Sequence, residues 1–330
     1  MGFLYGWQCA ILPIAAASPT AGELNWSGMK RADTRPNEAE IDLSALGDNV
    51  SLVRSRIRPG TAIIAWVKAN AYGHGIVQVA RRLTEVDVEV LATGSLADAI
   101  AMRDAGISTP ILMMGAALPS AVPELLRNGL IPTVHCKELA EAVVKSATRR
   151  TPIYVKVDCG FGRLGIPLRD ADRFILDLAR HPRIEIAGLY THLPFADADG
   201  LSFARDRIAR FEALVRRLAQ NGLAIPVTQA RASAALLAGL EDHCTAVSPG
   251  ALLYGLSPVD AGLASPTGLR PVLTRILTRV IQISPWAGDR SMGRATPRAC
   301  GARRAWCRSA ASTATGRHVP IRMHSCWSMV

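Results

Sequence analysis

Some features are scarce or missing in the 330-residue sequence, and each absence excludes a class of protein. No run of about 18 apolar residues is present, so a helix that spans a membrane is not expected. Apolar residues nevertheless make up 49% of the chain, which excludes a disordered or collagen-like protein. The length allows one large α/β barrel or two medium domains.

Two common motifs are also missing. No CxxC pair occurs, so the seven cysteines fit no zinc pattern and no metal site is predicted. No GxGxxG follows the first predicted strand, which weakens a dinucleotide-binding interpretation. The cysteines in the middle of the chain, Cys136, Cys159 and Cys244, lack disulfide spacing. That pattern is compatible with a reducing compartment, so we expect a cytoplasmic protein.

Residues 1–34 are predicted to be an extension outside the folded body. The first 29 residues contain one charge, Glu23, and no basic residue precedes Lys30. A secretory signal needs a basic segment before its apolar core, so a signal peptide is disfavoured. We favour a start of translation at Met29, with the preceding residues as upstream sequence; a disordered extension is the alternative.

Residues 290–330 have an aberrant composition. From Pro285 to Val330 there are eight arginines and one acid, Asp289, which gives +7 of the whole chain's +11. This tail lacks apolar periodicity of either 2 or 3.6. Our first hypothesis is a frameshift in a GC-rich gene, a bias that agrees with five lysines against 33 arginines. The alternatives, in decreasing order of preference, are a disordered tail, a nucleic-acid arm and a Cys/His metal site. We therefore expect no nucleic-acid partner.

Between these ends, short β-branched runs alternate with segments of helical spacing. Eight runs are predicted to be strands: Thr61–Val67, Val88–Ala92, Pro110–Met114, Leu130–Val134, Pro152–Val157, Ile184–Tyr190, Ile225–Thr228 and Thr245–Val247. Helices are predicted at Ile76–Thr84, Leu96–Ala105, Ala121–Arg127, Ala171–Leu178 and Ser202–Gln220. The alternation favours a (β/α)8 barrel of the TIM type over residues 35–264, with a doubly wound open sheet as the alternative.

The pattern changes after Pro258. In Pro271–Ser284, Val and Leu alternate with Thr and Arg, which predicts a long strand. We interpret residues 265–289 as the opening strand of a β-rich C-terminal domain, which stays incomplete because the reading frame is expected to fail next.

Function in a barrel collects at the C-terminal ends of the strands. The first predicted strand ends in the segment Trp66–Gly75, with Lys68 directly after the strand. Lys68 is either an ordinary surface lysine or a lysine with a lowered pKa, suited to forming a Schiff base. Composition alone would favour the surface lysine.

The whole segment Trp66–Gly75 resembles the pyridoxal-phosphate attachment motif of the alanine racemase family. Further segments that resemble this family follow in order along the chain: Tyr154–Gly165, Tyr190–His192, Arg231–Ala234 and Ser248–Gly255. The resemblance covers roughly residues 35–290 and implies a barrel followed by a β-rich domain.

The resemblance implies a role for each matching residue. Lys68 would hold pyridoxal 5'-phosphate as an aldimine and act as one of two racemising bases. Tyr72, Ser233 and the backbone amides of Gly250 and Ala251 would bind the phosphate, since hydroxyls and N–H groups donate hydrogen bonds to it. Two further residues complete the implied site: Arg163, which would bind the substrate carboxylate near the cofactor, and His192, which would lie against the cofactor ring. The predicted catalytic residues are Lys68, Arg163 and His192.

The implied reaction is the interconversion of L- and D-alanine in a homodimer. Inversion needs acid/base groups on both faces of the substrate, and in this family the second is a tyrosine from the partner's C-terminal domain. No counterpart is found, because the last tyrosine in the chain is Tyr254. Ser248 also stands where the family commonly has an arginine that faces the pyridine nitrogen. Lys156 matches a lysine that is carbamylated in some members, but an unmodified strand lysine is an equal interpretation.

The sequence is compatible with three functions. The first is an amino-acid racemase of the alanine racemase type. The second is a related pyridoxal-phosphate barrel enzyme, such as a decarboxylase or a D-amino-acid aldolase, because Ser248, Cys159, Phe161 and the segment Leu193–Phe195 depart from the family pattern. The third is a non-catalytic pyridoxal-phosphate-binding protein. The Tyr154–Gly165 match and the start of a β-rich domain favour the first.

Overall fold

The computed structural model describes residues 37–278, except residues 116, 194, 196 and 264–267. The predicted N-terminal extension and the aberrant tail lie outside the described residues, as does the last part of the predicted strand Pro271–Ser284. The described chain falls into two compact units, one running from Asp42 to Val272 and the other containing strands β1 and β11. The domain boundaries expected at residues 34, 264 and 289 stay predictions.

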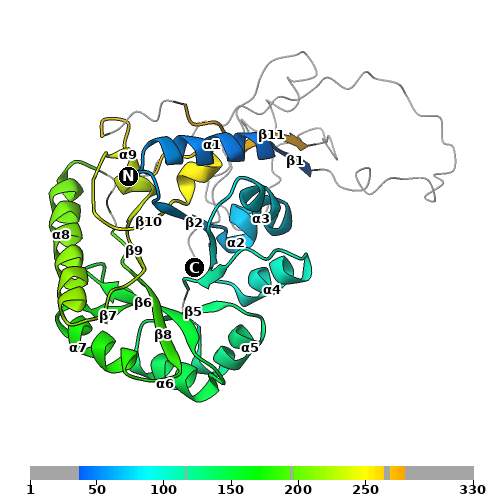
Figure 1. Cartoon of the computed structure of the whole chain (residues 1–330). Coiled ribbons are helices and arrows are strands. Elements are labelled where there is room, and N and C mark those ends of the chain that lie inside the picture. Colours follow the sequence, from blue (N-terminus) through cyan, green and yellow to red (C-terminus); the bar gives the residue numbers. More distant parts are fainter. Residues whose placement is uncertain (1–36, 116, 194, 196, 264–267, 279–330) are drawn as a thin grey trace, which may run out of the picture. The chain divides into compact units, whose positions relative to one another are not determined.

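The unit Asp42–Val272 is a closed barrel of parallel strands (Figure 1). Its eight strands are β2 (Ala62–Trp66), β3 (Val90–Thr93), β4 (Ile111–Met113), β5 (Ile131–Val134), β6 (Thr151–Asp158), β8 (Ile184–Tyr190), β9 (Val227–Ala232) and β10 (Ala246–Ser248). Strand β5 pairs with β6 and β10 pairs with β2, so the ring closes. The predicted (β/α)8 barrel is confirmed, and the alternative of an open sheet is wrong.

Helices form the outer ring around these strands (Figure 1). The larger ones are α1 (Leu43–Ser55), α3 (Ile76–Glu85), α4 (Leu96–Asp104), α5 (Val122–Arg127), α6 (Lys137–Ser146), α7 (Leu168–Ala179) and α8 (Asp199–Gln220). Short elements are α2 (Lys68–Tyr72), α9 (Ser233–Leu237), η3 (Pro119–Ala121), η4 (Ala251–Tyr254) and the two-residue strand β7 (Ile166–Pro167), which pairs with β6. No helix of the described part is long and apolar enough to cross a membrane.

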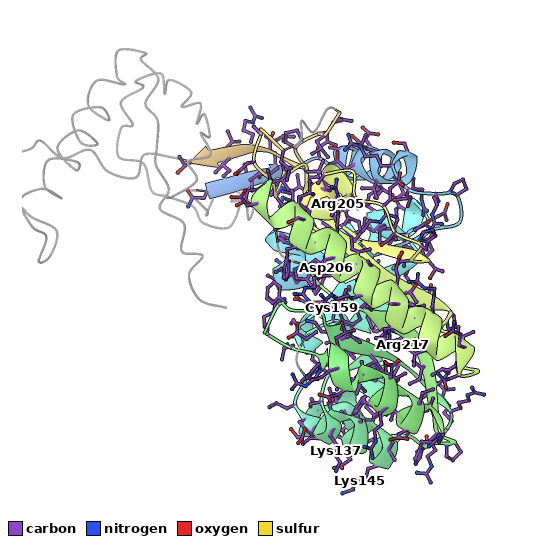
Figure 2. All side chains as sticks on the ribbon, turned by 90° about the vertical axis from the view of Figure 1, so that its left-hand side faces the viewer. Lys137, Lys145, Cys159, Arg205, Asp206 and Arg217 are labelled. Carbon is purple, nitrogen blue, oxygen red and sulfur yellow. The ribbon has the colours of Figure 1, made fainter. Side chains whose placement is uncertain are left out.

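Each of the five helices expected from apolar spacing is found, while α1 and α6 were not predicted individually. Helix α1 begins where the Asp42 carboxylate accepts hydrogen bonds from the backbone N–H groups of Ser44 and Ala45, at 2.8 and 3.0 Å. Helix α8 is the longest helix of the described residues and carries charges of both signs, with Arg205, Asp206 and Arg217 along it (Figure 2).

Two apolar layers hold the barrel together. The interior layer contains Ile64, Leu112, Tyr154 and Tyr190, which point away from the helices. The outer layer packs the other face of the strands against the helices, and its members include Ile153, Val155, Ile175, Phe211 and Leu214. Alternate residues of one strand therefore serve opposite faces, as Ile153 and Tyr154 do on β6.

The second unit contains an antiparallel pair, β1 (Asn37–Ile41) and β11 (Leu273–Thr278). The guanidinium of Arg275 pairs with the carboxylate of Glu40 across the two strands. Strand β11 lies within the predicted strand Pro271–Ser284. Its partner β1 was not predicted, because five residues with three polar side chains give little apolar alternation.

Candidate active site at the mouth of the barrel

The predicted site residues all follow the C-terminal ends of barrel strands. Lys68 comes two residues after β2, Arg163 lies in the loop after β6, and His192 comes two residues after β8. Ser233 directly follows β9, and Gly250 follows β10. Because the strands are parallel and the ring is closed, these positions meet at one rim of the barrel.

Lys68 is exposed at this rim and has two aromatic neighbours. Its ammonium nitrogen lies 5.9 Å from the ring centroid of Trp66 and 5.6 Å from that of Tyr72. The amine is therefore accessible to a ligand that approaches the mouth and is flanked by apolar faces.

The chain after Lys68 adopts an unusual left-handed turn. Four consecutive non-glycine residues, Ala69 to Tyr72, have φ between 52° and 55°. Such backbone costs about 1–2 kcal/mol per L-residue, so neighbouring contacts must hold it. The side-chain oxygen of Asn70 accepts a hydrogen bond from the N–H of Ile76 at 2.8 Å. Nδ1 of His74 lies 3.0 Å from the carbonyl oxygens of both Ala71 and Tyr72, so this nitrogen carries the proton.

A small polar cradle lies beside this turn. Ser233 Oγ accepts hydrogen bonds from the backbone N–H groups of Gly250 at 2.9 Å and Leu252 at 3.4 Å, which leaves its hydroxyl proton free to donate. A β-carbon built on Gly250 would lie 2.6 Å from the hydroxyl oxygen of Tyr72. Burial raises the pKa of Tyr72 to about 12, so its hydroxyl stays a donor. Hydroxyls and backbone amides in this arrangement suit a phosphate group.

Cationic groups occupy the side of the mouth formed by β6 and β8. Lys156 is buried on β6, and burial, followed by the charge of Arg163, lowers its pKa to about 8. Burial lowers the pKa of His192 to about 4, with smaller contributions from the cations Arg163, Lys156 and Lys68. His192 is therefore neutral at pH 7. Its ring packs against the ring of Phe161 at 5.3 Å between centroids.

The loop that carries Arg163 is ordered by one carboxylate. Asp158 accepts hydrogen bonds from the backbone N–H groups of Gly160, Phe161 and Gly162, at 2.8–3.2 Å. The guanidinium carbon of Arg163 lies 4.4 Å from the centroid of the Phe161 ring. With Asp158 engaged by its own loop, Lys156 and Arg163 give this side of the mouth a positive potential that suits an anionic substrate.

Comparison with known proteins agrees with this geometry. Residues 41–258 match the family described as "Alanine racemase, N-terminal domain". The chain belongs to the alanine racemase family.

Several alanine racemases are similar to this family member over most of its length. The alanine racemase of Methanococcus maripaludis is 34% identical over 245 residues, which cover 73% of this chain and 66% of the relative. That of Geobacter sp. (strain M21) is 35% identical over 234 residues, covering 68% of this chain and 62% of the relative. The chain thus spans slightly less than two thirds of the length of these relatives.

Solved alanine racemase structures share the fold. The enzyme of Clostridium difficile 630 in complex with cycloserine has a TM-score of 0.69 at 28% identity, covering 72% of this chain and 67% of that one. The enzyme of Bacillus anthracis with bound L-Ala-P has a TM-score of 0.66 at 31% identity, covering 72% and 63%.

Sequence reasoning missed several residues around the alanine racemase-type mouth. His135 directly follows strand β5, and burial followed by the charge of Lys156 lowers its pKa. The hydroxyl of Tyr190 donates to the Met114 carbonyl or to Thr133 inside the barrel, at 3.4 and 3.3 Å. The carboxylate of Asp98 accepts a hydrogen bond from the N–H of Asn70 at 3.1 Å. His135 could have been found from the sequence, because it directly follows the predicted strand Leu130–Val134.

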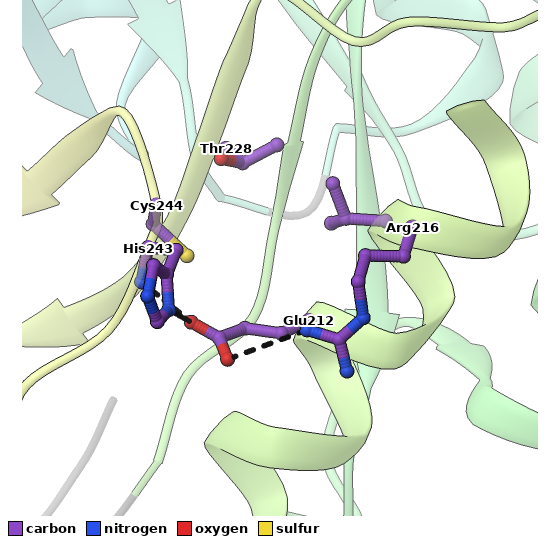
Figure 3. Close-up of a pocket in the computed structure, with 6 residues that line it drawn as sticks. Glu212, Arg216, Thr228, His243 and Cys244 are labelled. Atoms are coloured by element: carbon purple, nitrogen blue, oxygen red, sulfur yellow. Dashed lines mark hydrogen bonds and ion pairs between the residues drawn. The ribbon is translucent and has the colours of Figure 1, made fainter. Parts of the chain in front are cut away.

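A hollow of about 380 Å³ lies at the other end of the strands (Figure 3). Thr228 near the start of β9 and Cys244 just before β10 line it, so it is far from the C-terminal strand ends. The Glu212 carboxylate there is engaged by His243 and Arg216. Among the described residues no group of three or more His, Cys, Asp or Glu side chains could hold a metal ion.

Proposed function

We propose that this chain is the cofactor-binding barrel of a pyridoxal-phosphate-dependent amino-acid racemase that interconverts L- and D-alanine. One observation carries the proposal: the amine of Lys68 and the cradle of Tyr72, Ser233 and Gly250 lie at the same end of the barrel. A small ligand that carries both an aldehyde and a phosphate needs an amine to bind the aldehyde and hydrogen-bond donors nearby to bind the phosphate. The family membership supports the same conclusion.

The residues present fit pyridoxal 5'-phosphate. A β-carbon at Gly250 would contact the Tyr72 hydroxyl, so the absence of a side chain there keeps the cradle open. The hydroxyls of Tyr72 and Ser233 and the amide of Ala251 would hold the phosphate, and the amine of Lys68 would bind the aldehyde. The N–H of Gly250, also expected to bind the phosphate, instead donates to Ser233 Oγ and orients that hydroxyl. When bound, the cofactor's conjugated ring stabilises the negative charge left on a substrate α-carbon that has lost its proton.

The remaining groups would orient and protonate the substrate. Arg163 would bind the alanine carboxylate, because it is a cation on an ordered loop at the rim. His192 would lie against the cofactor ring as a neutral imidazole, since its pKa of about 4 keeps it uncharged. Lys68 Nζ would remove or return the α-proton on one face of the substrate.

The second face needs another acid/base group, which the family resemblance implies would come from the partner subunit of a homodimer. Tyr254 does not serve, because its hydroxyl donates to the Trp66 carbonyl at 3.1 Å and its side chain is buried. The second candidate function is a pyridoxal-phosphate-binding protein without racemase activity, since these contacts leave Tyr254 unable to act as the second base.

We also propose a cytoplasmic location for the protein. Cys136, Cys159 and Cys244, the cysteines within the described ranges, are all free thiols. Free thiols suit a reducing compartment.

Chiral analysis of alanine tests the two candidate functions. The full chain would be loaded with pyridoxal 5'-phosphate and incubated separately with L-alanine and D-alanine. Racemase function predicts that each enantiomer is converted to the other and that Lys68→Ala abolishes both conversions. A chain that binds the cofactor through Lys68 but inverts neither enantiomer would favour the binding protein. A chain that releases carbon dioxide from an amino acid, or that cleaves a β-hydroxy amino acid supplied in a parallel incubation, would favour the related barrel enzymes.

A further inference from the structure

A buried asparagine far from the cradle in sequence is bonded to the element that forms it. Asn49 lies on α1, is fully buried, and uses both amide hydrogens and its oxygen. Its Nδ2 donates to the carbonyl oxygens of Leu253 at 3.0 Å and Arg270 at 2.8 Å. Its Oδ1 accepts from the N–H of Arg270 at 2.9 Å. Leu253 belongs to η4, the turn that begins directly after Gly250.

Asn49 itself is held in place by a second contact between the same segments. The guanidinium of Arg270 pairs with the carboxylate of Asp42 at 2.9 Å and with that of Asp48, both at the start of α1 or within it. The backbone of Arg270 therefore stays against α1, so the two hydrogen bonds between Asn49 and Arg270 have a fixed partner. Together these contacts anchor η4 from the helix side.

Tyr254 anchors η4 from the opposite side, next to the lysine. Its hydroxyl donates to the carbonyl oxygen of Trp66, two residues before Lys68. Its ring lies 4.7 Å from the ring of Tyr72 and 4.9 Å from that of His74. One side chain of η4 thus touches both the end of the lysine's strand and the left-handed turn.

The turn between these anchors has little to hold it by itself. Helix η4 is four residues long and has no side-chain cap at its start. The N–H groups of Gly250 and Leu252, at its beginning, form the cradle with Ser233. The chain before Gly250 is tied to β2 by a hydrogen bond from the N–H of Trp66 to the carbonyl oxygen of Pro249 at 3.1 Å. The chain after Gly250 is held by the contacts of Asn49 and Tyr254 with η4, so the position of the cradle amides relative to Lys68 depends on these contacts as well.

We propose that Asn49 and Tyr254 are positioning residues that fix the cradle amides relative to Lys68, so that one ligand can be held at its aldehyde and at its phosphate together. This inference rests on the proposed function, because it assumes that the cradle takes the cofactor's phosphate. It predicts that loss of either anchor weakens binding through the phosphate and spares binding through the aldehyde.

The test compares pyridoxal 5'-phosphate with pyridoxal, which has the aldehyde and lacks the phosphate. Affinities of both would be measured from visible absorbance for the full chain, Asn49→Ala and Tyr254→Phe. The control is Asn221→Ala, which removes an exposed asparagine that donates to the Arg217 carbonyl at 2.8 Å. Both anchor variants should bind pyridoxal 5'-phosphate about tenfold more weakly, while their pyridoxal affinity changes less than about twofold. The control should match the unmodified chain for both ligands.

Inorganic phosphate supplies a second readout that does not involve the lysine. It should compete with pyridoxal 5'-phosphate in the unmodified chain, and about tenfold more phosphate should be needed in the anchor variants. Equal losses for pyridoxal and its phosphate, or no loss for either, would overturn the inference. If Asn49→Ala does not fold, Tyr254→Phe decides, since it removes a single hydroxyl and keeps the ring. An unmodified chain that binds pyridoxal 5'-phosphate no better than pyridoxal would instead overturn the proposed function.

Discussion

The hydroxyl of Tyr72 lies so close to the α-carbon of Gly250 that a β-carbon there would be 2.6 Å from the hydroxyl oxygen. Tyr72 comes from the turn after β2 and Gly250 from the turn after β10, so this contact joins the two neighbouring strand ends. The Tyr72 hydroxyl therefore occupies the space where a side chain at Gly250 would lie, and any side chain there would displace it.

We expect Gly250→Ala to weaken the affinity for pyridoxal 5'-phosphate by about tenfold. The added methyl group would displace the Tyr72 hydroxyl, because 2.6 Å is well inside van der Waals contact. Titration by visible absorbance measures the loss. Gly262→Ala is the matched control, since its new methyl group would meet nothing within 4 Å.

A double variant sharpens this prediction. In Gly250→Ala with Tyr72→Phe the clashing oxygen is gone, and the nearest ring carbon is 3.5 Å from the new methyl group. The double variant should therefore lose less binding free energy for pyridoxal 5'-phosphate than the sum of the losses in the two single variants, as is typical of residues in contact. Additive losses would show that Gly250 and Tyr72 act independently.

The left-handed turn predicts an unusual effect of glycine on stability. Ala69→Gly should raise the free energy of unfolding by about 0.5–1 kcal/mol, because relief of the positive φ outweighs the greater entropy of the unfolded chain. Ala101→Gly, in the middle of α4, should lower it by about 1 kcal/mol. Urea denaturation of both variants checks the pair. A loss in Ala69→Gly as large as in Ala101→Gly would contradict the strain.

The lowered pKa of Lys156 predicts that the free energy of unfolding depends on pH in the alkaline range. Burial lowers its pKa to about 8 in the folded chain from 10.5, so the unfolded state binds more protons between these values. Stability from this group therefore rises as the pH is raised from about 8 to 10.5. Lys156→Met should be more stable than the unmodified chain at pH 7, and the difference should vanish above pH 10.5. Lys145→Met, at an exposed position on α6, is the control and should show a difference that does not change over this range.

The lowered pKa of His192 predicts that the free energy of unfolding also depends on pH in the acidic range. Its pKa is about 4 in the folded chain against 6.5, so the unfolded state binds more protons between these values. The folded state is therefore destabilised progressively as the pH falls from 6.5 to about 4. His192→Phe keeps a ring against Phe161 and should lose part of this acid sensitivity in thermal melts at pH 4 and pH 7. The control His181→Phe should keep the full acid sensitivity. If His192→Phe also keeps it, groups other than His192 cause the effect.

The barrel could be predicted because its signals are local. Short β-branched runs mark all eight strands, and helical spacing marks α3, α4, α5, α7 and α8. The segments that carry Lys68, Arg163, His192, Ser233 and Gly250 were located by their resemblance to a family. The structure brings these segments to one rim, while the role of each residue stays a prediction.

Other features depend on contacts that a linear pattern does not encode. Asn49 bonds to Leu253, which is 204 positions away, and its polar side chain interrupts the apolar spacing of α1. The left-handed turn follows Lys68 and contains Ala69, Asn70, Ala71 and Tyr72, none of which is a glycine that would signal positive φ. Two residues outside the turn, Asp98 and His74, hold it through hydrogen bonds. Tertiary hydrogen bonds override local preference in both places.

Mapping of the covalent adduct tests the central claim most directly. The full chain and Lys68→Ala would each be mixed with pyridoxal 5'-phosphate, reduced with borohydride, digested and analysed by mass spectrometry. The account predicts a single stoichiometric adduct on the peptide that contains Lys68, and its loss together with the visible absorbance in Lys68→Ala. An unchanged absorbance in Lys68→Ala, or a stoichiometric adduct on Lys156 or another lysine, would contradict the assignment of the barrel mouth as the cofactor site.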